Sequence, residues 1–219
     1  MHVKFVNHQG EIELKKILKS LLGVTISAIG IAAVLNSGLG CFSITAANVA
    51  LSNWFGFSIG TANFITEGAM LAYATYKKEG VGWTAIFSAT VGSVMIDIFN
   101  AIIPLHPLSV IGLVLLPLGL AFEGSAGLGE TGSNMMLTAI LKNSKRNFSV
   151  SFLRTALEVS ALIIGFLGAR DLITPFTVIV SFGFGTLMQF IYKLVKFEPD
   201  KTEHKFIISK ERFNNEKTI

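Results

Sequence analysis

Three long stretches of the chain carry no charged residue, and they limit the possible folds more than any other feature. They comprise residues 20–66, 98–122 and 172–192. Charged residues make up 15% of the chain, against about a quarter in soluble globular domains. A helix of about 20 apolar residues spans the hydrocarbon core of a bilayer. The sequence therefore predicts a membrane protein and argues against a water-soluble enzyme.

Six segments are apolar and long enough to cross a bilayer as helices. They are residues 17–36, 57–76, 83–103, 108–127, 148–168 and 174–195. Two shorter helices are expected at residues 42–54 and 131–142, each after a Gly-Leu-Gly break, and they are either re-entrant or interfacial. We therefore expect an all-α, polytopic protein with a membrane domain at residues 17–195, an N-terminal segment at 1–16 and a tail at 196–219.

The basic residues indicate how these spans are oriented. Lys and Arg residues gather in residues 1–19, at Lys77 and Lys78, in residues 142–147 and from Lys193 onward, whereas the intervening loops hold none or only Arg170. Basic loops stay on the cytoplasmic side of a membrane. The alternation predicts six crossings of a bacterial plasma membrane, with both termini in the cytoplasm.

The chain matches itself weakly at an offset near 90 residues. The Gly-Leu-Gly at 38–40 aligns with that at 127–129, Phe57-Ser58 aligns with Phe148-Ser149, and Glu67 aligns with Glu158. Each repeat, 17–103 and 108–195, contains three spans. Because three is odd, the second repeat would enter the bilayer from the opposite face, as in many transporters.

Two acidic residues are expected in the middle of predicted spans, where an ionised side chain costs several kcal/mol unless it has a partner. Arg154 precedes Glu158 by four residues and shares its helix face, so an ion pair is available there. Asn63 holds the equivalent position before Glu67. We therefore expect Glu67 to be protonated or to contact a solute.

Polar residues also recur at helical spacing in the third and sixth spans. Ser93 and Asp97 belong to the first such stripe and Gln189 to the second. These stripes would line a shared polar interior, and close packing between helices is an equal alternative. The candidate substrate-binding residues are Glu67, Asn63, Ser93, Asp97, Arg154, Glu158 and Gln189.

Motifs for catalysis, cofactor binding and metal binding are missing from the sequence. The four histidines are scattered, and Cys41 is the single cysteine. We expect no cofactor, no metal, no nucleic-acid partner and no enzymatic activity. The expected partners are the lipid bilayer and a small polar or ionic solute.

The glycine-rich motifs resemble those of a known group of membrane proteins. They are the two Gly-Leu-Gly breaks, Phe-Ser-Ile-Gly-Thr at 57–61, Glu-Thr-Gly-Ser-Asn-Met-Met at 130–136, and residues 148–158 with Arg154 and Glu158. Over residues 17–195 the chain is similar to the bacterial YczE/YyaS/YitT-type integral membrane proteins. The resemblance implies a multi-pass fold in the plasma membrane rather than a particular activity.

Three hypotheses follow for the function. The leading one is a small-solute transporter, with proton coupling through Glu67 and a site near the bilayer midplane between the repeats. The second is a membrane-embedded regulatory or assembly protein that transports nothing. The third, an intramembrane enzyme, is the weakest because the sequence offers no pair of nucleophile and base.

Overall fold

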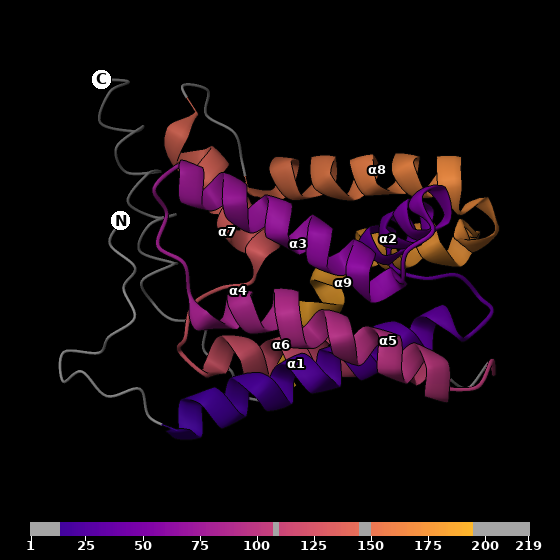
Figure 1. Ribbon diagram of the computed structural model, residues 1–219, viewed down its shortest axis with the longest axis horizontal. Helices are drawn as coiled ribbons and strands as arrows, with labels where there is room; N and C mark the ends of the chain where they lie inside the picture. The colour runs from indigo at the N-terminus through magenta and orange to yellow at the C-terminus, as the bar shows by residue number, and fades with distance from the viewer. Residues whose placement is uncertain (1–13, 107–109, 145–149, 195–219) are drawn as a thin grey trace.

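The computed structural model describes residues 14–106, 110–144 and 150–194, and the regular structure within them is helical (Figure 1). A π-helical turn, Ser88–Gly92, joins α4 (Trp83–Phe87) to α5 (Ser93–Ile102), and a 3-10 turn, Arg170–Leu172, precedes α9 (Pro175–Leu194). The helices are α1 (Leu14–Leu35), α2 (Ser43–Phe55), α3 (Ile59–Tyr76), α4 (Trp83–Phe87), α5 (Ser93–Ile102), α6 (Gly112–Ser125), α7 (Gly132–Asn143), α8 (Val150–Gly168) and α9 (Pro175–Leu194). The all-α prediction is confirmed, and both short helices lie within one residue of their expected bounds.

By length and composition alone, two helical stretches of the described residues could cross a membrane. They are Leu14–Leu35 and Trp83–Ile102. The six-span topology and the orientation of the termini stay predictions.

Helices α1 and α6 pack against each other in opposite directions and at close range. A Cβ atom placed on Gly30 of α1 would lie 2.5 Å from the backbone nitrogen of Leu116, and one on Gly112 of α6 would lie 2.3 Å from the carbonyl oxygen of Gly30. Seven residues away on each helix, Gly23 and Gly119 make a second such contact. Small residues allow helix backbones to approach closely, so these glycines set the distance between α1 and α6.

The two short helices pack on long helices from the other half of the chain. Helix α2 lies along the second half of α8, where Ala46 contacts Gly165 and Ala50 contacts Gly168. Helix α7 lies along the second half of α3, and Lys142 near its end pairs with Glu79 beyond α3. Each short helix therefore begins near the middle of its long partner and ends near that partner's last turn.

Each Gly-Leu-Gly break packs against the start of another helix just before a short helix begins. Gly40 has a φ of +124°, and a Cβ there would lie 2.3 Å from Oγ1 of Thr177, which accepts a hydrogen bond from the Cys41 amide. Gly129 has a φ of +101° and lies against Gly82, just before α4. Since L side chains disfavour this backbone conformation, glycine lets both breaks dock on the start of a helix.

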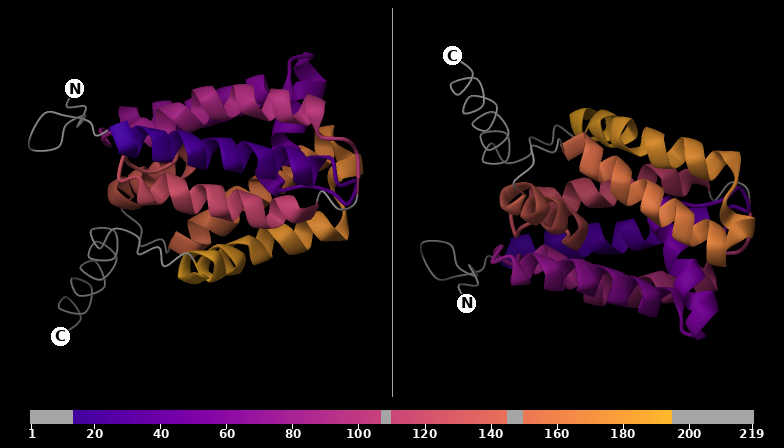
Figure 2. Two further views of the ribbon diagram at one scale, coloured as in Figure 1. Left: turned by 90° about the horizontal axis from the view of Figure 1, so that it is seen from below. Right: turned by 90° about the horizontal axis from the view of Figure 1, so that it is seen from above.

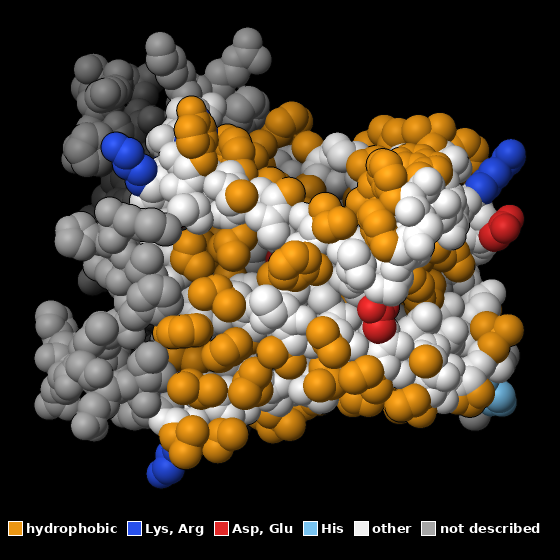
Figure 3. Space-filling view, viewed as in Figure 1, with side chains coloured by type: hydrophobic (Ala, Val, Ile, Leu, Met, Phe, Trp, Pro, Cys, Tyr) orange, Lys and Arg blue, Asp and Glu red, His pale blue; other side chains and the backbone are white. Residues whose placement is uncertain are grey.

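Large apolar side chains lie on the outer surface, and several polar side chains are buried. Large apolar side chains such as Leu167, Ile179 and Phe190 are more than 60% exposed, whereas Asn48, Glu123 and Thr177 are at most 3% exposed. Figure 3 shows hydrophobic side chains spread over one face, with Lys and Arg side chains toward its two ends. An apolar core cluster around Val34, Cys41, Phe42, Leu116 and Phe184 joins α1, α2, α6 and α9.

Candidate functional site

One cavity lies between the helices of the two halves and collects most of the buried charged side chains. It offers about 130 Å³ in which the centre of a water molecule can move, and a single water needs about 10–15 Å³ by this measure. Three carboxyl groups and one guanidinium group line it: Glu67 from α3, Glu123 from α6, and Arg154 and Glu158 from α8. The cavity therefore has room for several waters or a small solute beside these groups.

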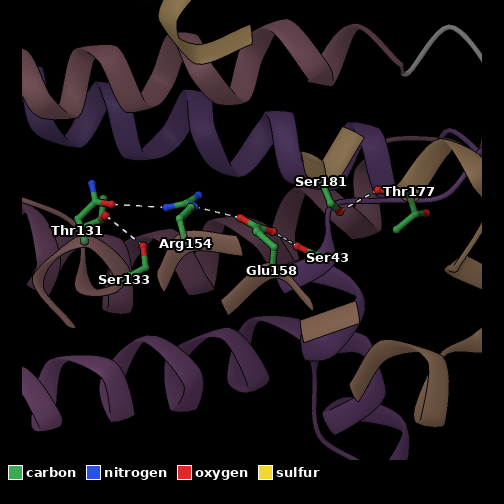
Figure 4. Close-up of polar contacts among 8 residues, drawn as sticks. Ser43, Thr131, Ser133, Arg154, Glu158, Thr177 and Ser181 are labelled. Carbon is green, nitrogen blue, oxygen red and sulfur yellow. Dashed lines mark hydrogen bonds and ion pairs between the residues drawn. The ribbon is translucent and has the colours of Figure 1, made fainter. Parts of the chain in front are cut away.

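Glu158 is 7% exposed and is held by donors from two helices (Figure 4). Its Oε1 accepts a hydrogen bond from Nε of Arg154 at 3.1 Å, and its Oε2 accepts one from Oγ of Ser43, the first residue of α2. The expected ion pair on one helix face is confirmed. The hydroxyl at the start of α2 is a partner that sequence spacing could not supply.

Glu67 takes the matching position against the start of α7. Its Oε2 lies 2.5 Å from where a Cβ of Gly132 would sit, so the carboxyl faces the first residue of α7. A helix N-terminus is a favourable place for negative charge. Within the described residues, Oε2 of Glu67 is buried and has no hydrogen-bond partner.

Glu123 is a cavity residue that the candidate set from the sequence does not include. It is 1% exposed, and its Oε1 accepts a hydrogen bond of 2.6 Å from Oγ of Ser27 on α1. Its Oε2 is buried and has no hydrogen-bond partner among the described residues. The signal in the sequence was an acidic residue inside the predicted span at residues 108–127.

Asn63 and Ser93 form a buried hydrogen-bonded chain at the edge of this site. The Asn63 amide accepts a hydrogen bond from Nδ2 of Asn48 and donates one to Oγ of Ser93, both at 3.0 Å. Asn63 lines the cavity, whereas Ser93 holds Asn63 in place from α5 without lining it. Ser93 is therefore a positioning residue rather than a candidate for solute contact.

Asp97 lies away from the cavity, contrary to the expectation that it contributes to a polar core. Its carboxylate accepts hydrogen bonds from Oγ of Ser58 at 2.5 Å and from the Gly60 amide at 2.7 Å. Both donors belong to the start of α3, so Asp97 caps that helix. The physical reason is the packing of α3 on α5: a Cβ added to Gly60 would lie 2.5 Å from Oδ2 of Asp97, so the carboxylate contacts the start of α3 rather than the cavity.

We expect Asp97→Ala to lower the free energy of unfolding by about 1–3 kcal/mol, because it leaves donors at the start of α3 without their acceptor. Thermal unfolding of the purified protein in detergent measures this loss. Ser58→Ala, which removes one of the same hydrogen bonds, should destabilise in the same direction. An unchanged melting temperature in Asp97→Ala would contradict the capping role.

Gln189, the remaining candidate, belongs to α9, but its side chain lies outside the described part of the structure. Of the sequence-predicted site residues, the structure brings Glu67, Asn63, Arg154 and Glu158 together around one cavity. It adds Glu123, Ser27 and Ser43 from helices that sequence reasoning had assigned no role in the site.

The comparisons with known proteins give one match. A protein family described as a family of unknown function (DUF6198) matches residues 14–193. No curated protein and no solved structure matches the chain.

Proposed function

The chain belongs to the DUF6198 family of unknown function, and we propose that it is a small-solute transporter of the bacterial plasma membrane. The observation that carries the proposal is the cavity shared by both halves, lined by Glu67, Glu123, Arg154 and Glu158. We also propose that the chain is similar to the YczE/YyaS/YitT-type integral membrane proteins, as its glycine-rich motifs indicate.

The apolar outer surface and the buried polar side chains support a location in the membrane. Exposed apolar side chains such as Leu167 and Ile179 would be costly in water but are favourable against lipid tails. Buried Asn48, Glu158 and Thr177 avoid the lipid by bonding within the protein. This pattern favours a multi-pass protein over a soluble bundle.

The directions of the helices support two inverted repeats (Figure 2). In Figure 1, α1 and the α4–α5 stretch of the first repeat run from left to right, and α3 runs from right to left. In the second repeat each direction is opposite: α6 and α9 run from right to left, and α8 runs from left to right. The cross-packing is also matched: α2 on α8 corresponds to α7 on α3. By this correspondence, Glu158 of α8, which contacts the start of α2, matches Glu67 of α3, which faces the start of α7.

The charges at the ends of the helices support the orientation with cytoplasmic termini. Lys19 near the start of α1 bonds the end of α6, and Lys142 of α7 bonds Glu79 beyond α3, so these basic residues share one end. Arg170 lies at the other end, after α8. The basic end would face the cytoplasm.

The transport mechanism we propose is a rocking of one repeat against the other, which exposes the cavity to each side in turn. The two short helices would move with their long partners. Glu67 would bind the coupling proton, because its unpaired buried oxygen requires either a proton or a solute to offset the cost of burial.

Alternating exposure can be tested without knowing the solute. In a Cys41→Ala background we introduce Ser181→Cys, which places a thiol in the cavity wall. We expect a membrane-impermeant maleimide to label it from both sides of the membrane in right-side-out and inside-out vesicles. Ile163→Cys is the control, since Ile163 is 56% exposed on the outer surface and lipid should protect it from both sides.

The alternatives give different labelling patterns. A regulatory or assembly protein with a sealed interior predicts that Ser181→Cys is labelled from neither side, and this result would contradict transport. Labelling from one side alone would contradict alternating exposure. Proton coupling predicts that pH changes the ratio of labelling from the two sides, and that adding Glu67→Gln abolishes this dependence.

A further inference from the structure

The unpaired groups of the cavity show what a bound solute must offer. This inference rests on the proposed function, because it concerns the solute of the same cavity. Oε2 of Glu123 and Oε2 of Glu67 are buried and lack a partner within the described residues, and Glu123 is 1% exposed. Once its proton has left, a carboxylate oxygen only accepts hydrogen bonds. A solute that completes the site therefore brings N–H or O–H donors.

The charge balance of the cavity favours a cation among such solutes. Arg154 is already bonded to Glu158, which leaves Glu67 and Glu123 without a positive group in hydrogen-bond contact. The cavity wall therefore holds three carboxyl groups against one guanidinium group. Because unpaired charge is costly at low dielectric, one positive charge between Glu67 and Glu123 stabilises the cavity, whereas an anion would be repelled.

The helix N-termini in the cavity do not favour an anion either. Such termini commonly bind anions through their free backbone amides. Here Glu158 already contacts Ser43 at the start of α2, and Glu67 already faces Gly132 at the start of α7. The protein's own carboxyl groups take the positions that an anionic solute would use.

Part of the cavity wall is apolar and suits a short hydrocarbon chain. Phe42 and Phe184 line it and pack edge to face, with ring centroids 5.4 Å apart. Ile31 and Leu116 extend this apolar wall. A solute with a charged end and an apolar end would match both parts of the cavity.

We infer that the cavity binds a short primary amine in its ammonium form, with the ammonium group donating to Glu67 and Glu123 and the alkyl chain lying against Phe42 and Phe184. An ammonium group has three N–H donors, enough for both unpaired oxygens and one water. The proposal thus names alkylammonium ions as the substrate class.

Three probes of similar size test the inference by calorimetry on the full chain in lipid nanodiscs. They are n-butylammonium, its isomer tetramethylammonium, which has the same charge but no N–H donor, and butyrate, which has the same number of carbon atoms and the opposite charge. We expect n-butylammonium to bind, tetramethylammonium to bind at least about tenfold more weakly because its hydrogen bonds are lost, and butyrate not to bind. Binding of butyrate in preference to n-butylammonium would overturn the inference.

Matched variants locate the binding. Glu123→Gln and Glu67→Gln should each weaken n-butylammonium binding at least about tenfold, whereas Glu79→Gln, at the exposed pair with Lys142, should leave it unchanged. Circular dichroism and gel filtration verify that each variant is folded. If Glu123→Gln does not fold, Glu67→Gln alone tests the assignment. Unchanged binding in the folded variants would refute the assignment.

The binding experiment can refute the ammonium assignment without refuting the transport proposal, and the labelling experiment can do the reverse. Labelling of Ser181→Cys from both sides without n-butylammonium binding would leave transport standing and overturn the ammonium assignment. Binding that depends on Glu67 and Glu123, with Ser181→Cys labelled from one side, would retain the binding site and reject the transporter.

Discussion

A Gly30→Ala variant is expected to lose much of its stability through the addition of one methyl group. The added Cβ would lie 2.5 Å from the backbone nitrogen of Leu116 and 2.9 Å from its Cα, so α1 and α6 would have to move apart. Overpacking costs about 1–3 kcal/mol, and the upper end applies because backbone atoms cannot rotate away. The melting temperature in detergent measures the loss, at about 2–4 °C per kcal/mol for a chain of this size.

The same substitution at Gly68 is the control. Gly68 lies within α3 with nothing within 4 Å of the added Cβ, and alanine is favoured over glycine in a helix interior by up to about 1 kcal/mol. Gly68→Ala should therefore leave the melting temperature unchanged or raise it. Equal effects of the two substitutions would show that the α1–α6 contact is not as close as described.

Arg154→Met is the second change with a large expected effect. It leaves Glu158, 7% exposed, with Ser43 as its remaining described donor. Removing one partner of a buried ion pair costs about 3–5 kcal/mol. Because 35% of the Arg154 side chain is exposed, we expect a loss of about 3 kcal/mol, measured by thermal or denaturant unfolding in detergent.

Two further variants separate charge from packing. Arg154→Met combined with Glu158→Leu should recover most of the lost stability, since no unpaired charge remains. Lys142→Met breaks the more exposed pair with Glu79 and should cost no more than about 1 kcal/mol. If the double variant were less stable than Arg154→Met alone, the Glu158 carboxyl would be stabilising the fold without its arginine.

Several features were readable in the sequence because they depend on local spacing. The uncharged stretches predicted the long helices, and the Gly-Leu-Gly breaks predicted where α2 and α7 begin. The Arg154–Glu158 pair followed from a separation of four residues on one helix. The capping of α3 by Asp97 had no such signal, because its donors Ser58 and Gly60 belong to another helix.

The helices and the rarity of acids within them follow from the amino-acid sequence, because helix length and charge are properties of short segments. The helix ends that those acids contact depend on how the helices pack. Ser27 reaches Glu123 and Ser43 reaches Glu158 across more than 90 residues of chain, and nothing local encodes either contact. Such partners follow from the packing of α1 on α6 and of α2 on α8, where glycine and alanine allow the backbones to approach.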